Sequence, residues 1–211
     1  MSIKALRIVC GLAVVLATQS AALAADVVTD WAAVTPPPAP KLETLAAEPT
    51  TTALLVLDFN TPPCDPAKRP RCIATLPNAK ALLDKARAKG VLVIYTLGGA
   101  TAADTINPAL KPLGTEPLFS SGPDKFLNTD LDKALKEHGI KTVVTIGTDS
   151  NGAVLYTASE AAFRGYSVLV PIDGLSAETP YAEQFTLWQL LNGPRLGGDR
   201  VKLTRSDLLT F

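Results

Sequence analysis

The stretch that decides the fold is residues 141–171, "KTVVTIGTDSNGAVLYTASEAAFRGYSVLVP". An apolar run over 141–147 leads into a polar turn. Helical spacing then runs from 152 to 163, and a second apolar run covers 166–171. Short continuous apolar runs are typical of strands that are buried on both faces, and Gly165 is placed to end the helix. The stretch therefore predicts a strand, a turn, a helix and a second strand.

The same alternation continues on both sides of this stretch. The other predicted strands are 53–59, 91–96 and 200–204, and the other predicted helices run through 76–86, from Thr129 to Gly139, and over 180–192. Strands that alternate with helices indicate a parallel sheet covered on both faces. Ligands of such sheets bind at the carboxyl ends of the strands, where the strand order reverses. The sequence thus predicts an α/β domain with its site at that edge.

The bulk composition excludes one class of partner. The chain has 211 residues and is 47% hydrophobic, which suits one domain with a full core. Its 20 basic and 20 acidic residues balance, and only 6% of residues are aromatic. The chain therefore lacks both a basic surface for phosphates and a supply of aromatic rings for stacking on bases. We expect no nucleic-acid partner.

The N-terminus has the three-part pattern of a secretory signal peptide. Lys4 and Arg7 precede an apolar run over 8–17, and Ala22-Leu23-Ala24 fits a small-x-small cleavage site. The apolar run is short for a membrane span, although an uncleaved anchor is the alternative. Cleavage after Ala24 removes two basic residues and leaves 18 basic against 20 acidic ones, a net charge of −2. We expect a periplasmic or secreted protein with no membrane contact after cleavage.

Cleavage would also remove Cys10 and leave two cysteines. An even pair in an exported chain predicts a disulfide between Cys64 and Cys72, with two free thiols as the alternative.

Residues 25–50 are rich in Ala, Pro and Thr, and three consecutive prolines cannot join a helix or a central strand. We interpret them as an extended arm, packed on the body or on a second subunit through Trp31. The predicted organisation is a signal peptide over 1–24, this arm over 25–50 and one α/β domain over 51–211.

Two strand ends carry polar side chains. Asp58 ends the first predicted strand, and "GTDS" at 147–150 ends the strand before the helix of the opening stretch. A carboxylate at the end of a buried apolar strand is costly unless it has a partner or a task. Asp58 is therefore the main candidate for an acid or base.

At these residues the chain resembles the isochorismatase-like, or cysteine hydrolase, superfamily. The segments that carry the likeness are "TALLVLDFN", "KFLNTDLDKALKEHGIKTVVTIG", "GTDSNGAVLYTASEAAFRGYSVLVPIDGLSA" and the closing "VKLTRSDLLTF", which together span about residues 50–211. The resemblance implies a three-layer α/β/α, Rossmann-type fold with a parallel sheet of roughly six strands. It also implies a small-molecule substrate or ligand and a homo-oligomer.

Members of this superfamily usually carry an Asp, a Lys and a Cys in the site. The Asp matches Asp58, whereas the Cys falls at Ala153, so the thiol nucleophile is missing. Counting back along "DKFLNT" puts the lysine position near Ser120 or Ser121, so we expect the lysine to be missing too, unless Lys125 takes its place. The resemblance offers a precedent: isochorismatases carry Gly at the cysteine position and cleave a vinyl ether, with the Asp as general acid.

The remaining site predictions follow from the same comparison. The Asp-x-His metal site of the nicotinamidase branch is absent because position 60 is Asn60, and we predict no metal and no cofactor. Backbone N–H groups over 151–153, at a helix N-terminus, would favour an anion. The predicted substrate-binding residues are Asn60, Ser120, Ser121, Lys125, Thr148, Asp149, Ser150, Asn151, Gly152 and Ala153.

Other nucleophiles fit the sequence less well. Ser150 has no nearby base, since His138 is the only histidine and falls near a helix end. Cys64 cannot attack if it is oxidised. Asp149 either caps the turn or touches the substrate. Two functions stay open: an exported hydrolase of a small carboxylated molecule that uses Asp58 without a cysteine, and a catalytically silent small-molecule-binding or scaffolding protein.

Overall fold

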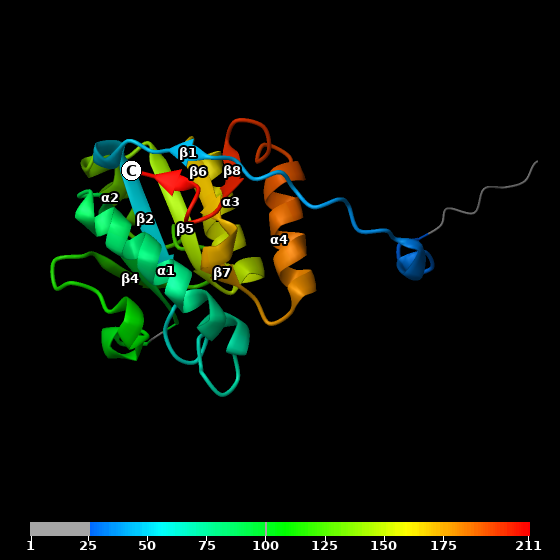
Figure 1. Ribbon diagram of the computed structural model, residues 1–211, viewed down its shortest axis with the longest axis horizontal. Coiled ribbons are helices and arrows are strands. Elements are labelled where there is room, and N and C mark those ends of the chain that lie inside the picture. The colour runs from blue at the N-terminus through cyan, green and yellow to red at the C-terminus, as the bar shows by residue number, and fades with distance from the viewer. Residues whose placement is uncertain (1–25, 100) are drawn as a thin grey trace, which may run out of the picture. The chain divides into compact units, whose positions relative to one another are not determined.

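A computed structural model describes residues 26–99 and 101–211 (Figure 1). The chain divides into two compact units, with the boundary in the sequence between Pro38 and Ala39. The predicted signal peptide lies outside the described residues. The described part of the first unit contains a short 3-10 helix, η1 (Trp31–Ala33), with no buried side chain. Within the described ranges no helix is both long enough and apolar enough to cross a membrane.

The second unit is built on a parallel sheet. The strands are β2 (Thr52–Leu57), β3 (Leu92–Gly98), β4 (Leu118–Ser121), β5 (Thr142–Thr148), β6 (Ser167–Pro171), β7 (Leu175–Ser176) and β8 (Val201–Thr204). The order is β4-β3-β2-β5-β6-β8, and β7 pairs with the end of β5. Successive strands are added outward on one side from β2 and on the other side from β5. The strand order therefore reverses between β2 and β5, which is where sheets of this kind bind ligands.

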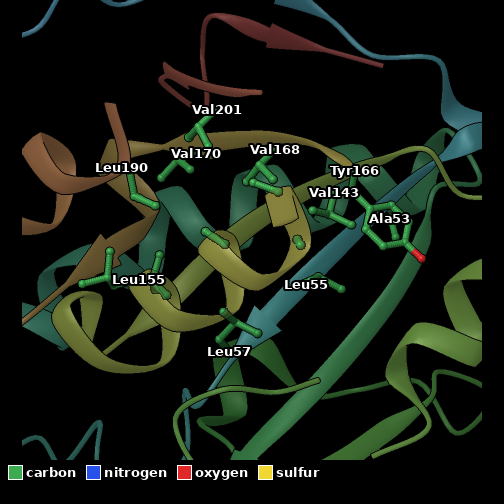
Figure 2. Close-up of a cluster of buried hydrophobic side chains, with 14 of the residues drawn as sticks. Ala53, Leu55, Leu57, Val143, Leu155, Tyr166, Val168, Val170, Leu190 and Val201 are labelled. Atoms are coloured by element: carbon green, nitrogen blue, oxygen red, sulfur yellow. The ribbon is translucent and has the colours of Figure 1, made fainter. Parts of the chain in front are cut away.

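Helices cover both faces of this sheet, so the predicted three-layer α/β/α fold is confirmed. The helices are α1 (Pro70–Ala88), α2 (Leu131–Glu137), α3 (Leu155–Phe163) and α4 (Pro180–Asn192), with a π-helical turn, η5 (Ser150–Val154), leading into α3. Helices α2, α3 and α4 pack on one face, where Leu55, Val168 and Leu190 share an apolar cluster (Figure 2). Helix α1 packs on the other face.

The edges of several predicted elements differ in the structure. Helix α1 begins at Pro70, before the predicted 76–86, because proline is tolerated in the first turn of a helix. The helix predicted from Thr129 begins at Leu131, and the Thr129 hydroxyl accepts a hydrogen bond from the Leu131 N–H at 3.3 Å. The helix predicted over 180–192 is confirmed at both ends.

Short elements complete the unit. They are β1 (Leu45–Ala46), β9 (Leu209–Thr210) and the 3-10 helices η2 (Pro49–Thr51), η3 (Ala103–Thr105), η4 (Pro108–Leu110) and η6 (Ile172–Gly174). Strands β1 and β9 form a parallel pair, and the Glu43 N–H donates to the Leu203 carbonyl at 3.0 Å. The arm predicted over 25–50 is thus part of the second unit from Ala39 onward.

Candidate active site

Asp58 lies directly after β2, buried, with 6% of its surface exposed. Its φ of 55° is in the left-handed region, which aspartate tolerates better than most residues. One carboxylate oxygen accepts a hydrogen bond from the Thr96 hydroxyl at 3.0 Å. A Cβ added at Gly98 would lie 3.2 Å from the other oxygen, so the glycine leaves room for the carboxylate. Strand β3 therefore both orients Asp58 and makes space for it.

Lys125 forms a buried ion pair with Asp58. Its Nζ lies 2.7 Å from Asp58 Oδ2, and its side chain is fully buried. The same Nζ lies 3.4 Å from the carbonyl oxygens of Leu97 and Ser121. Three acceptors match the three donors of an ammonium group. The expectation of a site without a lysine is therefore wrong, and the alternative, that Lys125 takes this place, is what the structure shows.

Two threonines fix the backbone of Lys125. Its N–H donates to the Thr157 hydroxyl of α3 at 3.2 Å, and its carbonyl accepts from the Thr129 hydroxyl at 2.6 Å. Thr157 also donates to the Pro123 carbonyl at 3.3 Å. The segment after β4 is thereby folded against α3, and this brings Lys125 to Asp58. No sequence pattern marks either threonine for this role.

The electrostatics of the pair are dominated by burial. Burial raises the pKa of Asp58 above its ordinary value of 3.8, and the charge and hydrogen bond of Lys125 and the hydroxyl of Thr96 offset this only in part. Loss of water disfavours the charged form of a carboxyl group. Asp58 therefore holds a proton at a higher pH than a solvated aspartate does, which suits a group that exchanges protons with a ligand.

The turn after β5 lies at the same edge of the sheet. Leu57 and Gly147 are register partners on the adjacent strands β2 and β5. A Cβ at Gly147, whose φ is +153°, would lie 2.3 Å from the Leu57 carbonyl oxygen, so only glycine allows the two strand ends to approach this closely. The bond between Thr148 and Asp149 is a cis peptide. Ala153 follows in η5, 4% exposed, and packs in the same apolar cluster as Leu57.

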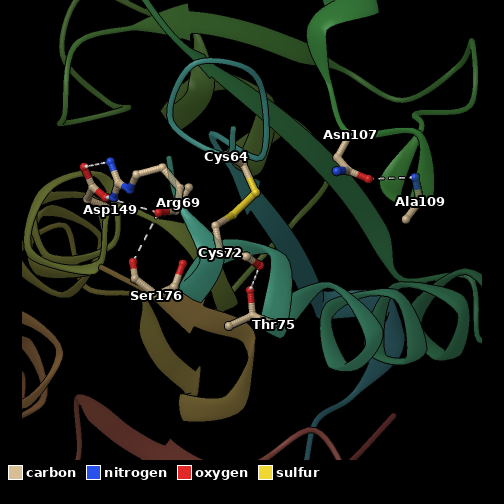
Figure 3. Close-up of a disulfide and its surroundings, with 9 residues drawn as sticks. Cys64, Arg69, Cys72, Thr75, Asn107, Ala109, Asp149 and Ser176 are labelled. Carbon is tan, nitrogen blue, oxygen red and sulfur yellow. Dashed lines mark hydrogen bonds and ion pairs between the residues drawn. A yellow bond between two sulfur atoms is a disulfide. The ribbon is translucent and has the colours of Figure 1, made fainter. Parts of the chain in front are cut away.

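A disulfide loop reaches this turn. Cys64 and Cys72 are bonded, with Cα atoms 5.5 Å apart, so the predicted disulfide is confirmed (Figure 3). Arg69, inside that loop, forms an ion pair with Asp149, and its Nη1 also lies 3.4 Å from Oδ2 of the same carboxylate. Arg69 is a site-edge residue that the sequence analysis missed, because nothing in the sequence links it to a turn 80 positions away. Asp149 thus has a basic partner at the edge of the site.

Two further predicted site residues, Asn60 and Ser150, are buried but have different partners. Asn60 is fully buried, and its Nδ2 donates to the Thr101 hydroxyl at 3.1 Å, while its Oδ1 has no partner among the described residues. The Ser150 hydroxyl accepts from Thr186 of α4 at 3.3 Å, so it contacts a packed helix.

The remaining predicted polar residues contact the backbone or solvent. The Thr148 hydroxyl donates to the Ser176 carbonyl at 3.2 Å. The Ser121 hydroxyl donates to the Asp124 carbonyl at 2.9 Å, and that of Ser120, which is exposed, contacts the Gly99 carbonyl. Asn151 is exposed and Gly152 is partly buried. Over residues 26–99 and 101–211, no group of three or more His, Cys, Asp or Glu side chains could hold a metal ion.

The three-layer fold and the buried acid–lysine pair at the switch point of its parallel sheet define the chain as an α/β protein with a candidate ligand site. The model of the Isochorismatase domain matches residues 52–196, more than half of the chain. The chain therefore belongs to the isochorismatase family.

Solved structures share the fold at low identity. A cysteine hydrolase from Pseudomonas syringae is 20% identical, with a TM-score of 0.68 over 80% of this chain and 94% of that one. An isochorismatase-like hydrolase from Alkaliphilus metalliredigens is 24% identical, with a TM-score of 0.65 over 74% and 95%. N-carbamoylsarcosine amidase from Thermoplasma acidophilum is 22% identical, with a TM-score of 0.63 over 74% and 97%. Among curated proteins none matches.

Proposed function

We propose that this chain is an exported isochorismatase-like hydrolase of a small carboxylated molecule, which acts through Asp58 without a cysteine nucleophile. The observation that carries the proposal is the buried Asp58–Lys125 pair, with Ala153 at the neighbouring strand end where the family resemblance expects a thiol. The N-terminal pattern over 1–24 supports export.

The residues present favour proton transfer over covalent catalysis. A thiol hydrolase forms an acyl intermediate on a thiolate, and the methyl group of Ala153 cannot do so. Asp58 exchanges protons, and its raised pKa increases the fraction that is protonated at mildly acidic pH. It gives a proton to the bond that breaks, or takes one from the attacking water. An ester, an amide or a vinyl ether next to a carboxylate fits this chemistry.

Lys125 supports Asp58 by charge and position. Its ammonium is held by Asp58 and two backbone carbonyls, so it stays in place when a ligand arrives. A fixed positive charge stabilises the carboxylate that remains after Asp58 has given up its proton. Together with the positive end of the helix that follows β5, it also favours a negatively charged ligand at this edge.

A second candidate is a binding or scaffolding protein on the same fold. The observation that favours it is the packing of Ala153 into the apolar cluster, which leaves the cysteine position without any reactive group. The two candidates differ in turnover and share the expectation of a small carboxylated ligand.

The deciding experiment screens small carboxylated esters, amides and vinyl ethers for turnover, with ligand binding followed by thermal shift. Asp58→Asn is expected to reduce turnover at least about 100-fold, because the amide cannot exchange a proton. Asp132→Asn is the matched control. Asp132, in α2, is also a carboxylate with a basic partner, Lys136, but it accepts its hydrogen bond from Tyr166 and does not contact Asp58 or Lys125. Iodoacetamide should leave activity unchanged. Binding without turnover would replace the hydrolase by the binding protein.

The export part of the proposal has its own test. Protein purified from the periplasm should begin at Ala25 by N-terminal sequencing. An intact Met1 in a soluble cytoplasmic fraction would contradict export.

A further inference from the structure

Helices α3 and α4 expose five large aromatic side chains. They are Tyr156, Phe163, Tyr181, Phe185 and Trp188, each between 42% and 67% exposed, and we call this set the α3–α4 aromatic surface. The three on α4 recur at i, i+4 and i+7, so they share one side of that helix. The two helices pack against each other on one face of the sheet.

The composition of α4 is unusual for a solvated helix. Its only charged side chain is Glu183, which accepts hydrogen bonds from Arg71 and from the Ala177 N–H. The solvent side of a surface helix normally carries several charged residues. An exposed apolar helix side with few charges, as on α4, is typical of an interaction site.

The second exposed apolar set lies in the first unit. Val27, Val28, Trp31 and Val34 are between 62% and 76% exposed. Prolines follow at 36, 37, 38 and 40. Proline-rich segments adopt the extended polyproline conformation and dock on aromatic surfaces with little loss of entropy. From here on, the arm means residues 26–38, the described part of the first unit, and not the whole predicted stretch over 25–50.

The start of the second unit and α4 both pack against one apolar cluster. Leu42 packs against the same apolar cluster as Leu187 and Leu191 of α4. The prolines keep the connection extended, because a residue before proline is pushed away from the helical region. We take a second copy of the chain as the acceptor, because an extended segment can reach a neighbouring molecule.

The charges of the two sets are complementary. The arm carries Asp26 and Asp30 and no basic side chain. At the aromatic surface the guanidinium of Arg195 lies 5.6 Å from the centre of the Phe163 ring. A basic group at the rim would meet the acidic arm, which helps to set the register of docking.

We propose that the α3–α4 aromatic surface binds the arm of a second copy of this chain, so that two copies exchange arms. Trp31 supplies the main apolar contact, and the prolines lie along the aromatic side chains of α4. The exchange is reciprocal, because the same surface and the same arm occur in both copies. This proposal is independent of the catalytic role of Asp58.

The two tryptophans of the chain, Trp31 and Trp188, both belong to the proposed contact. The experiment measures the mass of the purified protein by light scattering over a dilution series. Trp31→Ser and Trp188→Ser should each raise the dimer dissociation constant at least about tenfold, because buried tryptophans contribute most to interfaces. Leu113→Ser, at an apolar side chain that is 54% exposed on a different loop, should leave the constant unchanged. Far-UV circular dichroism checks that each variant is folded.

Mixing the two variants tests the exchange itself. A dimer of either variant alone has no complete contact. A mixed dimer has one, because the Trp188→Ser copy keeps an intact arm and the Trp31→Ser copy keeps an intact aromatic surface. The mixture should therefore associate more tightly than either variant alone. A wild-type monomer at all concentrations, an effect of Trp188→Ser without one of Trp31→Ser, or no gain on mixing would each overturn the proposal.

Discussion

Two neighbouring residues of β3 contact two ion pairs that differ in their exposure to water. The hydroxyl of Thr96 contacts the Asp58–Lys125 pair, and that of Tyr95 contacts the Arg87–Glu116 pair. Both pairs have a shortest N–O distance of 2.7 Å. They differ in their access to water, since Lys125 and Asp58 have side-chain exposures of 0% and 8%, whereas Arg87 and Glu116 have 22% and 10%.

The structural pair is satisfied and partly hydrated. Arg87 donates to both carboxylate oxygens of Glu116 and to the Lys111 carbonyl, and the bond to Glu116 raises the pKa of Arg87. The pair fixes the segment between η4 and β4. In the site pair, burial raises the pKa of Asp58 despite the adjacent cation. The two pairs therefore have the same shortest N–O distance but a different electrostatic balance, and a pKa perturbed by burial is common at functional sites.

The largest expected effect is on breaking the buried pair. Lys125→Met leaves the Asp58 carboxyl buried without its cation, and we expect a loss of about 3–5 kcal/mol in the free energy of unfolding at neutral pH. Adding Asp58→Asn should recover most of this loss, because the double variant buries no charge. Urea denaturation of the four proteins gives the cycle. A loss for Lys125→Met within about 0.5 kcal/mol would show that the pair is hydrated after all.

The disulfide is expected to come next. Replacing Cys64 and Cys72 by serine opens a loop with a sequence separation of 8, which should cost about 2–3 kcal/mol on the chain-entropy model. Chemical denaturation of the oxidised wild type and the double variant measures the difference. Arg69→Gln in the oxidised protein is the companion variant, since it removes the ion pair with Asp149 and keeps the loop closed by the disulfide. If it lowers stability as much as opening the loop does, the contribution assigned to the disulfide is wrong.

Breaking the structural pair should have a smaller effect. Glu116→Gln keeps one hydrogen bond to Arg87 and removes the charge, and we expect a loss of about 1–2 kcal/mol with ligand binding unchanged. The same thermal-shift assay as for Asp58→Asn measures both quantities. An equal loss of ligand binding in Glu116→Gln and Asp58→Asn would remove the functional distinction between the two pairs.

The smallest expected effect is a change with pH. Because the pKa of Asp58 is raised on folding, the folded state binds more protons there than the unfolded state does, and this group's contribution to stability decreases as pH rises through the folded pKa. The contribution is complete below the unfolded value of 3.8. The stability of the wild type relative to Asp58→Asn should therefore increase as pH is lowered from 7 towards 4. The opposite slope would show that Lys125 outweighs burial.

The fold could be predicted from the sequence where burial repeats regularly. Strand β2 is buried at every position, and α4 has a proline at its start and a glycine after its end, so both were evident. Strand β4 was not, because its four residues, "LFSS", are only partly buried or exposed. The two-residue strands β1 and β9 are too short to show any period.

The site was predictable only in part, because the segment after β4 is irregular and its path in space does not follow from the sequence. Asp58 directly follows β2, and Ala153 lies in the turn η5 soon after β5, so the parallel topology places both. Lys125 reaches Asp58 through a loop whose shape depends on the hydroxyls of Thr129 and Thr157, and these contacts have no sequence pattern. Counting residues along a family motif therefore points to Ser120 or Ser121 and leaves Lys125 only as the alternative.

The pairing of β1 with β9 has a consequence for protein engineering. Leu45 and Leu209 are register partners, and Lys85 donates to the carbonyl oxygens of Ser206 and Leu209, so the beginning and the end of the second unit lie side by side. A short linker from Phe211 to Lys41 would span them, and a new start at the exposed Gly114 would leave the sheet order intact. The second unit is thus a natural template for circular permutation, with the arm free to be attached elsewhere.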